Sequence, residues 1–165
     1  LDIACGGNKK EGFTGIDIAE IEGVDIVHDL NVYPWPFEDN SIEEIHCSHY
    51  IEHVPDLIKF MNEIYRIMMP AARACFIAPY YSSIRAWQDP THVRAISENT
   101  YLYYNKAWRD VNKLDHYGIT ANFNIVQWGH AWTQEYASRS QDAKNFALLH
   151  YMNVVDDLWS YLEKI

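Results

Sequence analysis

Two short segments carry most of the side chains that could do acid–base or metal chemistry. The first, residues 48–53, reads Ser-His-Tyr-Ile-Glu-His. If a helical turn begins there, His49, Glu52 and His53 lie on one face at spacings of three and four residues. The two histidines could chelate a metal ion, but no third ligand is evident nearby, so we predict no metal. His49 is instead a candidate general base. The simpler alternative is that Glu52 and His53 hydrogen-bond each other and fix the loop.

The second segment, residues 87–94, reads Trp-Gln-Asp-Pro-Thr-His-Val-Arg. Its polar groups are costly to bury without hydrogen-bond partners, so we expect them to contact solvent, a ligand or one another. Asp89 could orient His92 as a base, and Arg94 could hold an anionic group of a substrate. A loop held by its own hydrogen bonds is the alternative, because Asp-Pro-Thr favours a turn. We predict His49, His92 and Asp89 as catalytic residues.

Aromatic residues are concentrated after residue 80 and surround the second segment in sequence. Aromatic walls with polar tips suit a planar or sugar-like acceptor, although most of these rings are expected in the core. The predicted substrate-binding residues are Glu52, His53, Tyr80, Trp87 and Arg94.

Short apolar strands that alternate with loops or a helix must position these segments. The pattern predicts strands at residues 1–4, 13–18, 24–27, 42–48 and 74–78. One helix, residues 56–69, has apolar residues at three-and-four spacing and is expected to end at Pro70. This order favours a parallel sheet covered on both faces, hence an α/β fold.

The second half of the chain has weaker patterns. Residues 80–118 read as a loop with one helix at 97–104, and residues 123–128 alternate like a strand. A helix is expected at residues 140–152, with Phe146, Leu149 and Met152 facing inward. Residues 157–165 fit a strand, although a continued helix also satisfies the pattern.

Composition narrows the class of protein. The chain has 165 residues, 48% of them hydrophobic and 22% charged, which suits one folded domain over residues 1–165. A net charge of −10 argues against general nucleic-acid or membrane binding, and no apolar run approaches the roughly 20 residues of a membrane span. Three widely spaced cysteines without a CxxC pair favour a reducing, cytoplasmic location. Because the chain opens on a strand pattern without Met, we expect the native N-terminus to lie upstream.

A glycine turn follows the first predicted strand, where residues 1–8 read Leu-Asp-Ile-Ala-Cys-Gly-Gly-Asn. Ligands of open α/β sheets bind beyond the carboxyl ends of strands, and glycines there let the backbone approach a ligand closely. Neither GxGxxG nor GxxxxGK[ST] occurs, which argues against the dinucleotide and phosphate-loop patterns.

Acidic or polar residues follow the next three strands in order. Asp17 could accept two hydrogen bonds from a ribose diol, Asp29 could take an adenine amino proton, and Ser48 and His49 follow the fourth strand. Each residue alone could be a turn residue or a helix cap. The ordered set indicates a ligand that contains a nucleoside.

In this order the segments resemble those of the class I S-adenosylmethionine-dependent methyltransferases. LDIACGGN is similar to the first motif, LDLGCGxG, while GIDI resembles the acidic second motif and VHDL the third. Residues 34–54 resemble the run into strand four, and residues 60–81 resemble the helix, turn and fifth strand. The resemblance implies a Rossmann-like three-layer sandwich with a mostly parallel seven-stranded sheet and an antiparallel last strand. It also implies S-adenosyl-L-methionine as cofactor and S-adenosyl-L-homocysteine as product.

The resemblance assigns cofactor-binding residues by position. Those around the methionine part are Asp2, Ala4, Cys5, Gly6, Gly7 and Asn8. Those around the nucleoside are Asp17, Ile18, Asp29, Leu30, Ser48 and His49. The sequence departs from the family at three points: Ala4 and Asn8 replace glycines, Pro70-Ala71-Ala72 replaces PGG, and only a loop separates the first two strands.

We therefore predict a methyltransferase that acts on oxygen or nitrogen of a small molecule or sugar, with residues 80–118 on the acceptor side. A catalytically silent cofactor-binding or protein-interaction module is the alternative, because of the departures from the motifs. A nucleotide-sugar or NAD-dependent enzyme is a third possibility, which the missing GxGxxG disfavours. The oligomeric state is left open.

Overall fold

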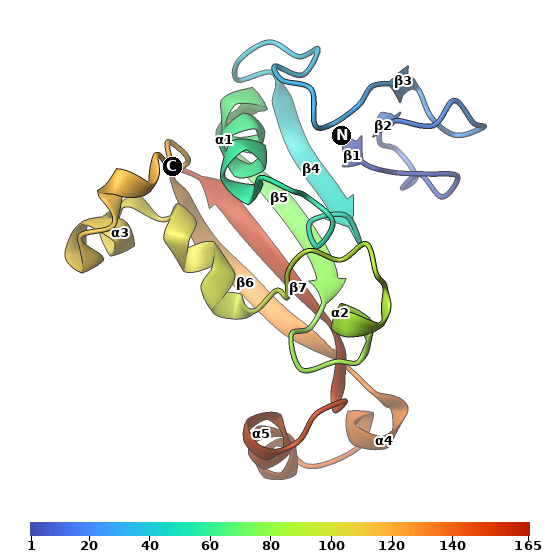
Figure 1. The fold of residues 1–165 in the computed structure, drawn as a ribbon, viewed down its shortest axis with the longest axis vertical. Helices are drawn as coiled ribbons and strands as arrows, with labels where there is room; N and C mark the ends of the chain where they lie inside the picture. The colour runs from blue at the N-terminus through green and yellow to red at the C-terminus, as the bar shows by residue number, and fades with distance from the viewer.

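A computed structural model describes all 165 residues and shows one seven-stranded sheet (Figure 1). The strand order is β3-β2-β1-β4-β5-β7-β6. Strands β1 to β5 pair in parallel, whereas β7 is antiparallel to both β5 and β6. The strands are β1 (Asp2–Ile3), β2 (Gly15–Asp17), β3 (Ile26–Val27), β4 (Ile42–Ser48), β5 (Met68–Pro79), β6 (Phe123–Trp132) and β7 (Val155–Lys164). The predicted fold class is confirmed, including the strand at residues 157–165.

Helices α1 and η1 cover one face of the sheet and build the core there. The Asp56 side chain caps α1 (Leu57–Ile67) by accepting a hydrogen bond from the amide of Lys59. Phe76 of β5 packs between the two helices, because its ring meets Phe60 of α1 and Tyr101 of η1 (Glu98–Tyr104). The predicted helix at residues 97–104 is therefore present, as a 3-10 helix.

Helix α1 ends at Ile67, three residues before the predicted stop, and Pro70 lies inside β5. The buried ammonium of Lys164 explains this end, because it donates to the carbonyls of Tyr65 and Met68 at 2.6 and 2.7 Å. Burial lowers the pKa of Lys164. With these carbonyls satisfied, the chain passes directly into the strand.

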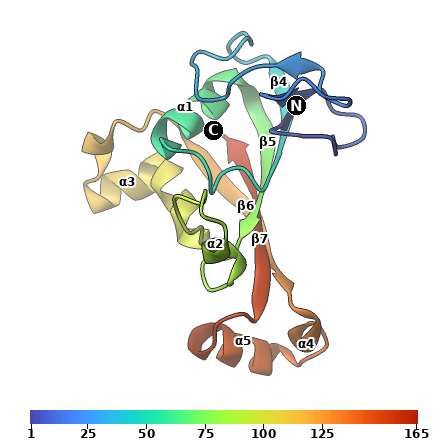
Figure 2. The same cartoon turned by 45° about the vertical axis from the view of Figure 1, so that its right-hand side comes forward.

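Residues 80–118 contain more structure than the sequence predicts. Besides η1 they hold α2 (Arg85–Gln88), α3 (Lys106–Asn112) and η2 (Asp115–Tyr117). Each is short, so no apolar periodicity reveals it. Figure 2 shows α2 near the carboxyl end of β5, whereas α3 lies at the left edge of the molecule in this view.

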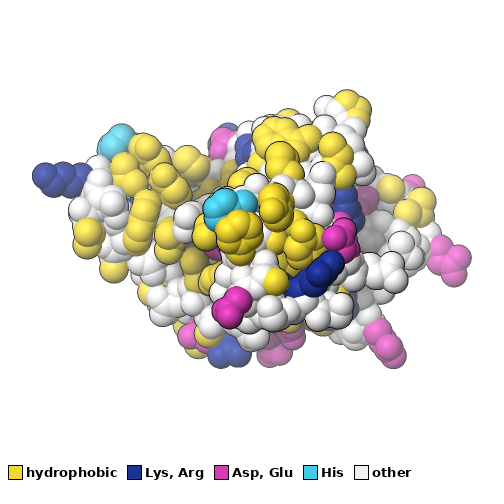
Figure 3. All heavy atoms as spheres, turned by 90° about the horizontal axis from the view of Figure 1, so that it is seen from below, with side chains coloured by type: hydrophobic (Ala, Val, Ile, Leu, Met, Phe, Trp, Pro, Cys, Tyr) yellow, Lys and Arg dark blue, Asp and Glu magenta, His cyan; other side chains and the backbone are white.

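The predicted inward face of the last helix is wrong. Helix α5 (Gln141–His150) follows the short α4 (Gln134–Ala137), and the Ser140 side chain caps it by accepting from the amide of Ala143. However, Phe146, Leu149 and Met152 are exposed, with Leu149 at 80%. The helix lies beyond the end of the sheet and buries only Ala147 fully (Figure 1). Figure 3 shows hydrophobic side chains gathered at this end of the molecule.

The opposite face of the sheet is more open, so the cover expected on both faces is present on only one of them (Figure 2). The connections from β1 to β2, from β2 to β3 and from β3 to β4 contain no helix, as expected for the first of them. A concavity of about 780 Å³ lies there, near the amino-terminal ends of β4 and β5, and it is lined by residues that include Arg73, Trp159 and Tyr161. None of the predicted site residues lines it.

Candidate active site

The glycine turn after β1 is held by the acid that ends β2. Ala4 and Gly6 both adopt positive φ, at 53° and 51°. One carboxylate oxygen of Asp17 accepts from the amide of Gly6, and the other accepts from the amide of Ala19, both at 2.9 Å. A carboxylate oxygen can accept more than one hydrogen bond, so Asp17 keeps capacity for a ligand. The glycine turn predicted to lie around the methionine part is therefore in contact with the acid predicted to bind the ribose.

Several aliphatic side chains in β3 and in the connections that follow β2 and β3 remain in solvent. Ile18, directly after Asp17, is 64% exposed. Three further aliphatic residues, which the sequence reasoning missed, are also exposed near these strand ends: Ile21, Val27 and Val32. Asp29 lies at the same edge, where one of its oxygens accepts from the amide of Asn31. Exposed aliphatic groups beside carboxylates suit a base and its ribose.

Three of the predicted cofactor residues point into the protein. Asp2 is buried and accepts from the amide of Lys10 and from His46 Nδ1, both at 2.7 Å. Leu30 is buried as well. The Cys5 side chain packs against Gly15, and burial raises the pKa of its thiol. These residues can shape the site, whereas Gly6 and the exposed Gly7 and Asn8 can touch a ligand.

We expect Ala4→Gly to leave the free energy of unfolding unchanged or to raise it by up to about 1 kcal/mol. A Cβ at positive φ costs roughly 1–2 kcal/mol, which offsets the higher entropy of glycine in the unfolded chain. Ala19→Gly is the matched control, because Ala19 lies at the same edge with ordinary φ and should lose stability. Urea unfolding measures both. Equal losses in the two variants would contradict this account of the turn.

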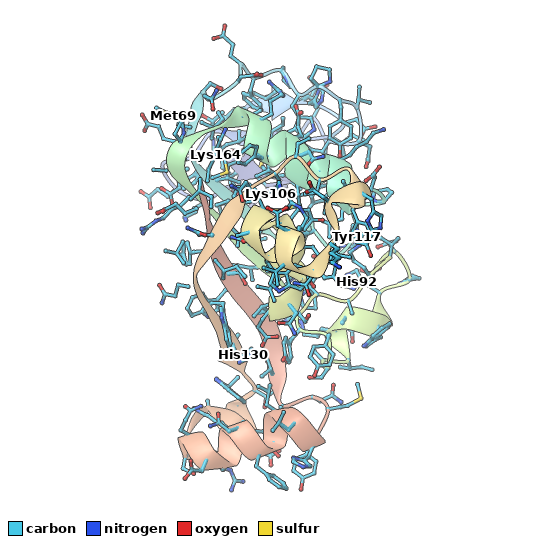
Figure 4. All side chains as sticks on the ribbon, turned by 90° about the vertical axis from the view of Figure 1, so that its left-hand side faces the viewer. Met69, His92, Lys106, Tyr117, His130 and Lys164 are labelled. Atoms are coloured by element: carbon cyan, nitrogen blue, oxygen red, sulfur yellow. The ribbon has the colours of Figure 1, made fainter.

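A polar pocket of about 220 Å³ opens beside the carboxyl ends of β4 and β5. It brings together both segments singled out in the sequence. Its lining residues are His49, Glu52, His53, Pro79, Arg85, Gln88, Asp89 and His92. Figure 4 shows His92 near the loop that carries α2, well away from Met69 and Lys164 at the other end of the sheet.

Glu52 lies at the centre of this pocket. Its Oε1 is 3.5 Å from His49 Nδ1 and 3.9 Å from His92 Nε2. The contact with Glu52 raises the pKa of His49, with a further contribution from the charge of Asp157, although burial opposes it. Glu52 makes no hydrogen bond to His53, so the alternative in which that pair fixes the loop is not what the structure shows.

Two predicted pairings in the second segment differ from the structure. Asp89 accepts from the amide and hydroxyl of Thr91, and its carboxylate is 4.0 Å from His92 Nε2. The carbonyl of Ala86, rather than Asp89, therefore orients His92, at 3.1 Å from Nδ1. Arg94 donates to the carbonyls of Val54 and Pro55, which leaves its guanidinium little freedom to bind an anionic substrate.

The two predicted aromatic residues lie outside the pocket lining. Tyr80 is buried and its hydroxyl donates to Glu98, with the His130 ring packed against it. Trp87 is 61% exposed and its indole N–H donates to the carbonyl of Tyr81. Tyr80 is thus a core residue. Trp87 is a residue of α2, and its exposed ring remains accessible to a ligand.

Three functional candidates were missed by sequence reasoning. Arg85 and Gln88 line the pocket from α2, and Asp157 pairs with Arg85 at 2.8 Å and lies 3.9 Å from His49 Nε2. Asp157 reaches this edge because β7 pairs with β5 so that it stands opposite Pro79. No local signal marks such a residue, because the strand pairing alone brings it there.

The strand order, the antiparallel β7 and the glycine turn bound to an acid at the end of β2 define the fold of the class I S-adenosylmethionine-dependent methyltransferases. Residues 1–76 match a family described as a methyltransferase domain. A solved S-adenosylmethionine-dependent methyltransferase from Archaeoglobus fulgidus superposes with a TM-score of 0.66 at 19% identity, over 99% of this chain and 84% of that one. The predicted resemblance is confirmed for the fold over the whole chain and for the methyltransferase domain over residues 1–76.

Two further comparisons extend this result. Phosphoethanolamine N-methyltransferase 2 from Haemonchus contortus, solved in complex with S-adenosyl-L-methionine, gives a TM-score of 0.54 at 15% identity, over 99% of this chain and 47% of that one. Demethylmenaquinone methyltransferase of Listeria welshimeri is 27% identical over 80 residues, which is 48% of this chain. That match spans about a third of the relative's length, 34%.

No helix of this structure is both long enough and apolar enough to cross a membrane.

Proposed function

We propose that this chain binds S-adenosyl-L-methionine at the carboxyl edge of β1 to β3 and transfers its methyl group to oxygen or nitrogen of a small polar acceptor. The observation that carries the proposal is the position of Asp17. Its carboxylate binds the glycine turn, and the polar pocket lies at the same edge of the sheet, after β4 and β5.

The residues at this edge fit the cofactor. Asp17 has acceptor capacity for ribose hydroxyls, and Ile18 offers an exposed aliphatic surface to an adenine ring. Gly6 and Gly7 leave room for a close backbone approach, since a Cβ at Gly6 would meet nothing within 4 Å. When bound, the cofactor supplies a methyl carbon activated by a sulfonium.

The lining of the pocket supports a polar acceptor, such as a sugar or another hydroxylated molecule. Apart from Pro79, every lining residue carries a polar or charged group. The ion pair of Arg85 and Asp157 provides donors and acceptors on one wall. The Listeria relatives are named for demethylmenaquinone, but a quinone would gain little from these polar side chains.

His49 is the residue best placed to take a proton from the acceptor. Its side chain is 38% exposed, against 8% for His92, so it is the more accessible of the two predicted bases. Nδ1 faces Glu52, which leaves Nε2 directed toward the side of Asp157 and Arg85. A proton held at Nδ1 would leave Nε2 free to accept one.

We expect His49→Gln to lower methyl transfer by about 100-fold or more, because general base catalysis contributes roughly 10²–10⁴-fold. The assay follows formation of S-adenosylhomocysteine with a panel of sugars and hydroxylated small molecules. His150→Gln is the matched control, because His150 is exposed on α5.

Other outcomes separate the alternatives. Binding of S-adenosylhomocysteine without transfer to any acceptor would favour a silent module. Competition by NAD for the same site would favour a nucleotide-dependent enzyme of another class. Unchanged transfer in His49→Gln would remove this residue from the proposed chemistry.

A further inference from the structure

Three potential metal ligands from two separate loops converge in the polar pocket. One donor atom from each of Glu52, His53 and His92 lies within 4.8 Å of the other two. Glu52 and His53 follow β4, whereas His92 comes from the loop after α2. The sequence shows no third ligand for a site built on His49 and His53, whereas the fold brings His92 to His53 and Glu52.

Glu52 is the strongest sign that something binds here. Its residue is 1% exposed, and neither carboxylate oxygen has a hydrogen-bond partner. Buried carboxylates are normally paired, hydrogen-bonded or bound to a metal, because desolvating an unpaired one costs several kcal/mol. The imidazoles of His49 and His92 come no closer to Oε1 than 3.5 and 3.9 Å. The carboxylate is therefore short of close partners.

The imidazole of His92 is held in the orientation that a metal ligand needs. Nδ1 lies 3.1 Å from the carbonyl of Ala86, which can only accept, so this nitrogen carries the proton. Nε2 then keeps its lone pair and faces Glu52 Oε1. A ligand histidine typically donates its other ring N–H to a carbonyl or carboxylate in this way.

His53 is held by an equivalent arrangement. The Thr91 hydroxyl donates its single proton to Asp89 at 2.6 Å, so it accepts from His53 Nδ1 at 3.0 Å. This leaves the lone pair on Nε2. The His53 and His92 rings meet edge to face, with their centroids 4.6 Å apart. Asp89 and Thr91 thus act as positioning residues for His53.

From this geometry we propose that Glu52, His53 and His92 bind a divalent transition-metal ion, with zinc as the type case. Two imidazoles and one carboxylate suit such ions, whereas Mg²⁺ prefers oxygen ligands and bound water. At metal bonds of about 2.0–2.2 Å the ligand atoms would lie roughly 3–3.5 Å apart, so an ion would draw together donor atoms that now lie within 4.8 Å of one another.

The two loops are already joined at this point. The amide of Val93 donates to the carbonyl of Glu52 at 3.0 Å. Three protein ligands would leave a position for an external group in a four-coordinate site. Coordination of an acceptor oxygen there rests on the proposed function, whereas metal binding itself does not.

The test is calorimetric titration of the chelator-treated, dialysed chain with ZnCl₂, and separately with MgCl₂. We expect one equivalent of Zn²⁺ to bind and no comparable binding of Mg²⁺. Glu52→Gln and His92→Asn should each weaken Zn²⁺ binding by at least about 100-fold, since losing a residue that only orients a ligand costs 10–100-fold. Thr91→Val should weaken it by about 10-fold. His150→Gln should change nothing.

Further readouts keep the test decisive. Co²⁺ titration reports the ligands directly, because its visible absorption should appear in the wild type and change in His92→Asn. Thr91 is exposed, so its variant should fold even if Glu52→Gln does not. Binding of S-adenosylhomocysteine by the same variants separates failure of the metal site from failure of the proposed function. No Zn²⁺ binding by wild type, equal affinity for Mg²⁺, or full affinity in both His92→Asn and Thr91→Val would overturn the proposal.

Discussion

Replacement of Asp17 by alanine is expected to weaken binding of S-adenosylhomocysteine by at least about 100-fold. The carboxylate would supply hydrogen bonds to the ribose, each worth roughly 1.5–3 kcal/mol when the acceptor is charged. It also holds the amides of Gly6 and Ala19, so its loss frees the glycine turn that must approach the ligand. Isothermal titration calorimetry measures the change.

Two matched variants separate these roles. Asp17→Asn keeps one acceptor oxygen and should lie between wild type and Asp17→Ala. Glu20→Ala removes an exposed acid from the same edge and should leave affinity within about twofold, because surface charges in water interact weakly. Equal affinity in Asp17→Ala and Glu20→Ala would contradict the assignment of the ribose site.

Replacement of Arg109 by methionine should lower the free energy of unfolding by about 3–5 kcal/mol. Arg109 is 1% exposed, and its guanidinium donates to the carbonyls of Tyr103, Ala121 and Ile119 at 2.8 to 3.2 Å. Methionine fills part of the volume but leaves all three carbonyls without a donor, and each buried orphan costs about 1–3 kcal/mol. Urea unfolding monitored by circular dichroism measures the loss.

Arg139→Met provides the control for this substitution. Arg139 is exposed and pairs with Glu135 at 3.8 Å, a contact that contributes little in water. We expect its unfolding free energy to change by less than about 0.5 kcal/mol. A small effect at Arg109 as well would show that its carbonyl contacts do not hold α3 against residues 119–121.

The elements that position the cofactor edge could be predicted because their signals are local. Strand β4 begins and ends where its apolar pattern does, and Asp56 caps α1 as its residue type suggests. Asp17 stands at a strand end by sequence, and the structure places its carboxylate on the glycine turn. Such features depend on a few neighbouring residues, which the chain order preserves.

The other features of the site depend on which elements pack against each residue in the fold. The local sequence pattern carries no information about these tertiary contacts. Leu149 has apolar spacing on α5, but no element packs on that side, so it stays exposed. Asp89 sits three residues before His92, yet its Oδ1 accepts from Thr91 and its Oδ2 stays 4.0 Å from His92 Nε2. The sequence marks Glu52 as a substrate-binding candidate, but only the fold shows that its carboxylate is buried without a hydrogen-bond partner between two loops.

The central claim is that the carboxyl edge of β1 to β3 binds the cofactor, and NMR mapping tests it most directly. Amide ¹H–¹⁵N spectra of the wild-type chain would be recorded during titration with S-adenosylhomocysteine. We expect the largest shifts at residues 4–8, 17–19 and 29–30, with little change around Arg73 and Trp159 on the open face of the sheet. Shifts confined to the 780 Å³ concavity on that face, or no shifts at saturating ligand, would contradict the account.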